Sequence, residues 1–406
     1  MSPQSRRRKP SRPSPERKPP TSVAALVLKD LEGAFTAPHS LVAECWASTF
    51  LGEAWSRASG EQAEAQLVRD VTSAILTRPS VAGLAALYAF RRLTTESAEP
   101  LDRAIGRLTR MFAPPAWADA PPAVPVAAWR ADDPWLSSRT LFLEYVDEAE
   151  QGYVLMVSAT TAGGLAVDAI DLAPSDSLDR WDSVAPDRPR RSVGVEEALA
   201  DMAEILTQTD MYWPRITGSY GSFRALAWSR CRAHVQELHW EPILLDRPPL
   251  LDDFCTLSAC DEYDPELIAS LGDLFIDFGE GYIDAHPLAW SPDHVETFLV
   301  GWLARKAALS PEQVEVLPDV LKIWVRFVLD ARGLDERWIV AVEEAVDEYA
   351  SDFWETFDDP SGWGPSKEIT TALLARGVDL TDPASVEAGI RAYNAEQLAR
   401  RAAGLD

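Results

Sequence analysis

Cysteine and histidine are scarce in this chain, and no long apolar run occurs. Four cysteines in 406 residues do not make a secreted disulfide framework. Five histidines without flanking catalytic signatures argue against a Ser-His-Asp triad. The best apolar stretch, Val81 to Phe90, is about half of the roughly 18 residues that a membrane span needs, and the run from Val23 to Leu28 is too short for a signal peptide. We therefore expect a soluble cytoplasmic protein with reduced thiols and no membrane contact.

Sequence motifs for common chemistry are also absent. Neither G-x-x-x-x-G-K-[ST] nor G-x-G-x-x-G occurs, so no phosphate-binding loop is predicted. G-x-S-x-G and H-E-x-x-H are missing as well. The sequence therefore identifies no catalytic residue. It leaves open whether the chain is an enzyme, and the missing motifs favour a protein without catalytic activity.

The first 20 residues carry a net positive charge, in contrast to the rest of the chain. This segment holds seven basic residues and one acidic residue, a net charge of +6, and is rich in proline and serine. The whole chain carries −26, which leaves −32 for the remainder. Such an acidic body repels phosphate backbones, so nucleic acid is expected to bind only through Arg6, Arg7, Arg8 and Lys9, if at all. The tail has too few apolar residues to fold, and a solvated end without a site is the other interpretation.

Apolar spacing predicts an α+β fold that is predominantly α-helical. Alternating residues near Leu141 and Leu165 and an apolar run from Val154 to Val157, joined by short Gly-containing connections, indicate a small antiparallel three-stranded sheet with covering helices. Cap-then-proline signals, as at Ser310-Pro311, start the helices of an all-α C-terminal bundle. The expected parts are a disordered basic tail (1–20), a helical N-terminal region (21–113), a small α+β domain (125–240) and an all-α module (264–402).

The C-terminal module carries a tryptophan-rich pattern. The stretch from His286 to Lys306, H-P-L-x-W-S-P-x-x-V-E-x-F-L-x-x-W-L-x-R-K, is followed by segments around Trp324 and Trp363. This pattern resembles the C-terminal module of an uncharacterised actinobacterial protein family. The segment Thr209-Asp-Met-Tyr-Trp213 with Arg224 extends the resemblance weakly upstream. The resemblance implies a bacterial, helical, cytosolic protein and transfers no catalytic residue, because that family has no assigned activity.

Two residue sets are candidate metal ligands. Three thiols and an imidazole are ligands that zinc accepts tetrahedrally. Carboxylates mixed with histidines build hydrolytic metal sites. Each set has a simpler interpretation. A cysteine and a histidine on the apolar stripe of a helix are explained as core residues, and the acidic groups as helix caps and surface residues. No cofactor is predicted, with zinc as the alternative. The first set is Cys231, His234, Cys255 and Cys260, and the second is Asp277, Glu280, Asp284, His286, His294 and Glu296.

The fifteen tryptophans are the most unusual count. Most of those in the C-terminal module are expected in the core, but tryptophan with arginine is typical of binding hot spots. If several line an exposed groove, they mark a partner site. The leading hypothesis is thus a non-catalytic cytosolic interaction or regulatory protein with an unknown protein partner. The alternatives are a zinc-dependent enzyme and weak nucleic-acid association through the tail. The candidate groove residues are Trp290, Trp302, Arg305, Trp324, Arg326 and Trp363.

Overall fold

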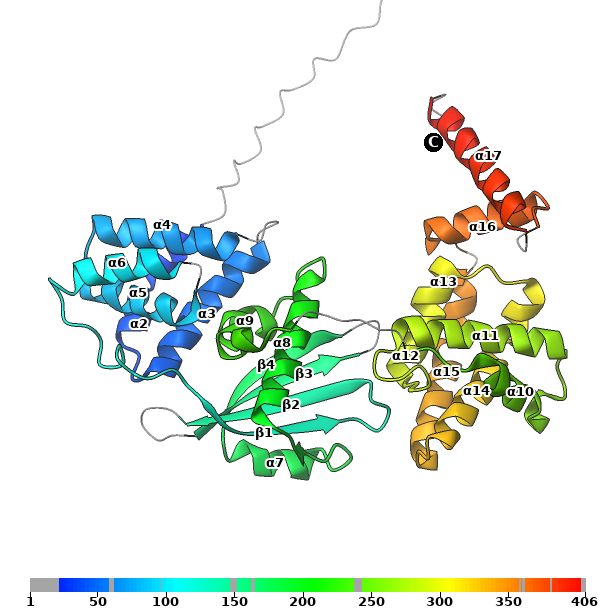
Figure 1. The fold of residues 1–406 in the computed structure, drawn as a ribbon, viewed down its shortest axis with the longest axis horizontal. Helices are drawn as coiled ribbons and strands as arrows, with labels where there is room; N and C mark the ends of the chain where they lie inside the picture. The colour runs from blue at the N-terminus through cyan, green and yellow to red at the C-terminus, as the bar shows by residue number, and fades with distance from the viewer. Residues whose placement is uncertain are drawn as a thin grey trace, which may run out of the picture. The chain divides into compact units, whose positions relative to one another are not determined.

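The fold is taken from a computed structural model (Figure 1). It describes residues 22–57, 62–95, 97–146, 152–161, 165–236, 243–357, 359, 362–379 and 382–402. The chain divides into two compact units, one up to Pro121 and one from Pro122 onward. No helix in the described ranges is long and apolar enough to cross a membrane.

The first unit is helical, and α5 is its central element. Helix α5 is apolar on nearly every face, and Leu84, Leu87 and Phe90 have no solvent exposure. The sequence starts it at Ser80, whose side chain accepts a hydrogen bond from the amide of Gly83 as the cap. The helices are α1 (Val23–Lys29), α2 (Leu31–Phe35), α3 (Ser40–Arg57), α4 (Ala63–Thr77), α5 (Val81–Leu93) and α6 (Ala98–Leu108).

The second unit begins with an antiparallel sheet that has five strands, where the sequence predicted three. The order across the sheet is β4-β3-β2-β1-β5. The additional β1 lies in a proline-rich stretch, where Pro125 is tolerated because it opens the strand. The additional β5 has only two residues, too few to show an alternating pattern. The strands are β1 (Pro125–Asp132), β2 (Ser138–Val146), β3 (Gly152–Thr160), β4 (Ala166–Pro174) and β5 (Arg191–Ser192).

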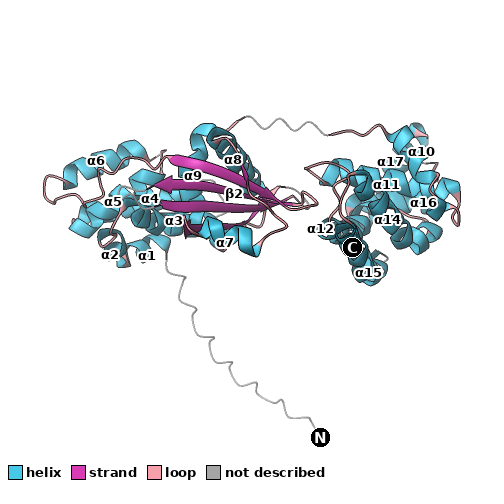
Figure 2. Cartoon of the chain, turned by 90° about the horizontal axis from the view of Figure 1, so that it is seen from below, coloured by secondary structure: helices cyan, strands magenta, loops and turns pink. Residues whose placement is uncertain are grey.

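Helices cover both faces of this sheet (Figure 2). Helices α8 (Val195–Met211) and α9 (Ser219–Cys231) lie on one face, and α7 (Ser177–Val184) lies on the other. Their helical stripes bury apolar side chains on the alternating apolar faces of the strands. Helix α9 ends at Cys231 and passes into a short 3₁₀ turn, Arg232–His234.

The β4 edge is closed by side chains from α8 and α9. The Thr209 hydroxyl accepts a hydrogen bond from the amide of Val167 (2.9 Å), and the Ser219 hydroxyl accepts one from the amide of Ile170 (3.1 Å). These two amides would otherwise face outward and be open to another strand. The closure fixes the junction of α8 and α9 against the sheet.

From Ile243 onward, the regular structure of the described residues is helical. Ser310 and Gln313 form the capping box that the sequence indicated. Helix α10 lies before the all-α module that the sequence predicts over 264–402, and the helical segment after Ser291 contains a π-helical turn. The elements are α10 (Arg247–Cys255), η2 (Ser258–Cys260), α11 (Pro265–Tyr282), α12 (Pro292–Glu296), η3 (Thr297–Trp302), α13 (Leu303–Lys306), α14 (Pro311–Ala331), α15 (Glu336–Phe357), α16 (Pro365–Ala375) and α17 (Pro383–Ala402).

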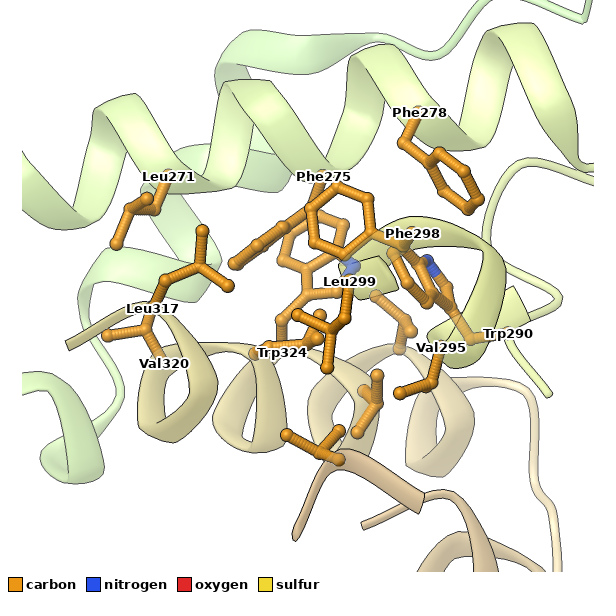
Figure 3. Close-up of a cluster of buried hydrophobic side chains, with 14 of the residues drawn as sticks. Leu271, Phe275, Phe278, Trp290, Val295, Phe298, Leu299, Leu317, Val320 and Trp324 are labelled. Atoms are coloured by element: carbon orange, nitrogen blue, oxygen red, sulfur yellow. The ribbon is translucent and has the colours of Figure 1, made fainter. Parts of the chain in front are cut away.

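An aromatic core joins these helices (Figure 3). Phe275 of α11 lies between Trp290 and Trp324, with ring centroids 6.3 Å and 5.8 Å away, and Phe298 meets Phe275 at 5.7 Å. All four side chains have no solvent exposure. Burying such large rings removes much apolar surface from water and stabilises the packing of these helices.

Candidate interaction site

The four residues of the proposed zinc set lie in different places. Cys231 is buried at the end of α9, where burial raises the pKa of its thiol to about 12. His234 faces Glu196, with 3.1 Å between Nδ1 and Oε2. Cys255 and Cys260 belong to the hydrophobic core of the C-terminal helices. Within the described residues, no three His, Cys, Asp or Glu side chains form a group that could hold a metal ion. The structure therefore does not bring three of these four side chains together, and zinc binding stays a prediction.

The acidic and histidine set is divided as well. Asp277 and Glu280 of α11 bind Arg247 at the start of α10, and Glu280 also accepts a hydrogen bond from the amide of Leu245. Burial raises the pKa of the Glu280 carboxyl, but the Arg247 bond and charge with the Leu245 amide outweigh it and lower the pKa overall. These two acids therefore serve to fix α10 on α11, not to bind a metal.

The other members of that set, with the neighbouring Asp293, lie where the C-terminal helices meet the sheet and its loops. Burial raises the pKa of Asp293, and the nearby charges of Asp133, Glu296 and Asp168 raise it further. Glu296 accepts a hydrogen bond from Tyr349. Burial raises the pKa of Asp284, and burial with the charge of Arg332 lowers the pKa of His286. Perturbed groups of this kind gather at functional sites, but also at structural junctions.

His294 is a buried structural member of the junction. Its Nδ1 lies 2.8 Å from the hydroxyl of Ser291, which also caps α12 by accepting from the His294 amide. Burial lowers the pKa of His294 to about 4, with the Thr161 backbone acting in the opposite direction. The side chain has no solvent exposure. A histidine held in this way is neutral near pH 7 and has no access to a substrate.

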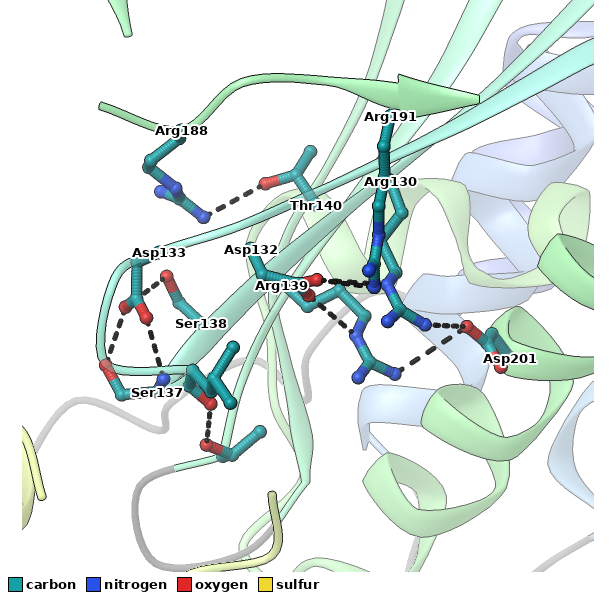
Figure 4. Close-up of polar contacts among 12 residues, drawn as sticks. Arg130, Asp132, Asp133, Ser137, Ser138, Arg139, Thr140, Arg188, Arg191 and Asp201 are labelled. Atoms are coloured by element: carbon teal, nitrogen blue, oxygen red, sulfur yellow. Dashed lines mark hydrogen bonds and ion pairs between the residues drawn. The ribbon is translucent and has the colours of Figure 1, made fainter. Parts of the chain in front are cut away.

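Asp133 shapes the turn that enters this junction (Figure 4). Its carboxylate accepts hydrogen bonds from the amide and hydroxyl of Ser137 (2.8 and 2.6 Å) and from the hydroxyl of Ser138 (3.1 Å). The turn carries Leu136 with a φ of 67°, a left-handed conformation that a leucine adopts only when its surroundings impose it. The conformation of the turn is therefore fixed by its own hydrogen bonds and its surroundings at the junction.

The tryptophans proposed for an exposed groove are mostly interior. Trp290 and Trp324 have no solvent exposure, and Trp302 packs on the same core, its ring stacked 5.6 Å from Phe298. Trp290 and Trp324 therefore do not line an exposed groove, which contradicts the prediction for these two residues. Tryptophan content alone does not distinguish a hot spot from a core, since both bury large rings.

The remaining groove residues also have structural contacts. Arg326 forms ion pairs with Glu343 and Glu336. Trp363 donates from Nε1 to the carbonyl of Phe357 (3.0 Å), which ends α15. Arg305 is exposed, and its carbonyl accepts a hydrogen bond from the amide of Gly364. The tail residues Arg6, Arg7, Arg8 and Lys9 lie outside the described residues.

A mixed-charge network lies on the α8 face of the sheet (Figure 4). Arg130 and Arg139 each contact both Asp132 and Asp201, at distances from 3.1 to 3.6 Å, and Arg191 pairs with Asp132 at 2.9 Å. Asp201 belongs to α8, whereas Asp132 ends β1. The charges compensate one another across the two elements, so the network fixes α8 on the sheet.

A second network, centred on Asp210 near the end of α8, has a different character. The Asp210 carboxylate accepts hydrogen bonds from the Tyr220 hydroxyl (2.6 Å), from Nε and Nη2 of Arg224 (2.8 and 2.6 Å) and from Nε1 of Trp228 (3.1 Å). Its backbone carbonyl accepts from Arg215 (2.5 Å). The two-pronged Arg224 contact fixes direction as well as distance. Asp210 thereby links the end of α8 to α9, so both ends of the segment between the two helices are fixed.

This anchored segment displays large apolar side chains. Met211 and Trp213 are 68% and 69% exposed, and Tyr212 between them is 36% exposed. Gly218, with φ +76°, ends the segment in a conformation that a side chain would disfavour, and α9 starts directly after it. We name Met211, Tyr212 and Trp213 the aromatic loop. Consecutive exposed apolar residues on a fixed loop are typical of a protein interaction site.

The sequence resemblance includes these residues but assigns them no role. Thr209 to Trp213 and Arg224 were part of the resemblance, but periodicity does not reveal which side of a helix end faces solvent. The sequence feature that indicates the site is Met-Tyr-Trp-Pro directly after a predicted helix. Three consecutive large apolar residues are unusual in a turn unless they are buried or contact a partner.

Comparison with known proteins adds no assignment. No protein-family model matches the chain, and neither a curated protein nor a solved structure is significantly similar to it.

Proposed function

We propose that this chain is a non-catalytic cytosolic protein that binds another protein through the aromatic loop. The observation that carries the proposal is the exposure of Met211 and Trp213 beside the fixed Asp210 network. Tryptophan, tyrosine and arginine dominate binding hot spots because they bury much area with few free torsions. Because the loop is fixed before binding, little conformational entropy is lost on association.

The partner expected from this chemistry is a protein with an apolar pocket. Trp213 and Met211 enter the pocket, and Tyr212 lies at its rim, where its hydroxyl stays near the Asp284 charge. We propose that residues 264–402 form an all-α bundle that supports the sheet and helices carrying the aromatic loop. The zinc-enzyme alternative has less support because its two ligand sets are spread over separate elements, and nucleic-acid association through the tail stays a prediction.

The test is affinity capture from lysate of the source cells with wild-type protein and two variants. Trp213→Ala removes the proposed anchor. Trp354→Ala is the matched control, since Trp354 is also exposed (49%) but lies on α15. We expect a saturable partner that wild type and Trp354→Ala retain and Trp213→Ala loses, with a dissociation constant at least about 30-fold weaker for the purified pair. Equal capture by all three proteins rules the loop out.

A fourth protein lacking residues 1–20 distinguishes the tail from the loop. Under the proposal, this shortened chain keeps the partner at the same affinity. Capture that depends on the tail and disappears after nuclease treatment supports nucleic-acid association instead.

A further inference from the structure

Helix α17 is long but has little packing of its own. Its 20 residues include no buried residue, and the helix it contacts most is α16. The contact is close at Gly389, where an added Cβ would come within 2.6 Å of Leu373. Helices in proteins depend on tertiary packing for most of their stability. Packing on one neighbouring helix buries little of the surface of a 20-residue helix.

Helices α16 and α17 meet near the turn between them and diverge from there (Figure 1). Their side chains line a hollow of about 1030 Å³. Its apolar lining includes Trp363, Ile369 and Leu398, and Leu398 is 66% exposed. An apolar hollow of this size between two helices lacks the side chains that usually fill such a space.

Charges of both signs line the same hollow. Glu368 of α16 contributes the acid, and Arg400 and Arg401 of α17 contribute the bases. A purely acidic or purely basic partner matches only one of these signs. A second copy of the same surface matches both, because a two-fold axis brings the acid of each copy to the bases of the other.

We propose that the hollow between α16 and α17 is the homodimer interface of this protein. Leu398 of each copy enters the hollow of the other, and Glu368 pairs with the arginines of the second copy. A 20-residue helix is about 30 Å long, which gives two copies a contact long enough for the roughly 1,000 Å² that a specific interface buries. The proposal is independent of the aromatic loop, which lies on another part of the chain.

The experiment is sedimentation equilibrium on the full-length chain and two leucine variants. Leu398→Asp places a charge in the proposed contact. Leu374→Asp is the matched control, because Leu374 is also exposed, on α16, but does not line the hollow. We expect a wild-type dimer, a dimer dissociation constant at least about tenfold weaker for Leu398→Asp, and no change for Leu374→Asp. Circular dichroism confirms that the helices are retained.

Charge reversal supplies a second test that a folding defect cannot imitate. Glu368→Arg and the double variant Arg400→Glu, Arg401→Glu each place like charges across the two-fold axis, so each alone is expected to be monomeric. Mixed together, the two variants are expected to form a heterodimer. A monomeric wild type, a dimer insensitive to Leu398→Asp, or no association in the mixture would each overturn the proposal.

Discussion

The indole nitrogen of Trp135 donates a hydrogen bond to the carbonyl oxygen of Trp338, 3.1 Å away, and the two rings meet edge to face with centroids 5.1 Å apart. Trp135 belongs to the β1–β2 turn, and Trp338 belongs to α15. The Arg337 guanidinium lies over the Trp338 ring and pairs with Asp187. The sheet and the C-terminal helices of the second unit are therefore joined by specific contacts.

Removing Trp135 should weaken this joint. Trp135→Ala loses the ring contact and the hydrogen bond, and we expect a loss of about 2–4 kcal/mol in the free energy of unfolding. Urea denaturation followed by circular dichroism measures it. Trp354→Ala, an exposed tryptophan on the same helix, is expected to cost less than about 1 kcal/mol. Equal losses for the two variants would mean that the turn contributes no more than an ordinary surface contact.

Asp210→Asn tests the anchor of the aromatic loop. The change removes the charge that Arg224 pairs with in a half-buried position, so we expect a loss of about 2–4 kcal/mol in stability and faster amide exchange over residues 211–218. Hydrogen exchange read by mass spectrometry follows both effects. Glu387→Gln breaks an ion pair with Arg391 that is exposed on both sides, and its expected effect is below about 0.5 kcal/mol. Unchanged exchange in Asp210→Asn would show that the loop is held by other contacts.

The buried His294 predicts a pH dependence of stability. Its pKa is lowered from 6.5 to about 4 in the folded protein. Below pH 6.5 the unfolded chain binds a proton that the folded chain refuses, so stability falls as the pH decreases from 6.5 toward 4. Asp293 and Asp284 act in the opposite direction, because burial raises the pKa of both carboxyls.

His294→Gln isolates the histidine contribution, because both carboxyls remain. We expect the free energy of unfolding of wild type to fall more steeply than that of His294→Gln between pH 6.5 and 4, by up to about 1.4 kcal/mol per pH unit. Urea titrations at several pH values give the two curves. Parallel curves would show that His294 is protonated equally in both states.

Two glycines of α11 should respond in opposite ways to alanine. A Cβ at Gly279 would collide with the carbonyl oxygen of Pro287, whereas a Cβ at Gly281 meets nothing within 4 Å. Gly279→Ala is therefore expected to destabilise by about 1–3 kcal/mol. Gly281→Ala is expected to stabilise by about 0.5–1 kcal/mol through helix propensity. Thermal unfolding of both variants checks the contrast, and the same sign for both would refute the close approach at Gly279.

The sequence by itself determined the features that depend on near neighbours. Ser80, Ser291 and Ser310 cap the helices that their patterns indicated, because a cap needs only a hydroxyl and an amide a few residues later. The predominance of helix and the antiparallel sheet followed from periodicity in the same way.

Only the tertiary structure decided which patterns face solvent. Trp290 and Trp324 are buried and Trp213 is exposed, although the residues next to them in the sequence do not distinguish the three positions. Cys231 and Cys255 belong to separate cores. Strand β5 exists because two residues pair with β1, more than 60 positions earlier: Ser192 with Trp129 and Arg191 with Arg130. Burial and pairing are set by contacts between segments far apart in the chain, whose relative positions no local pattern specifies.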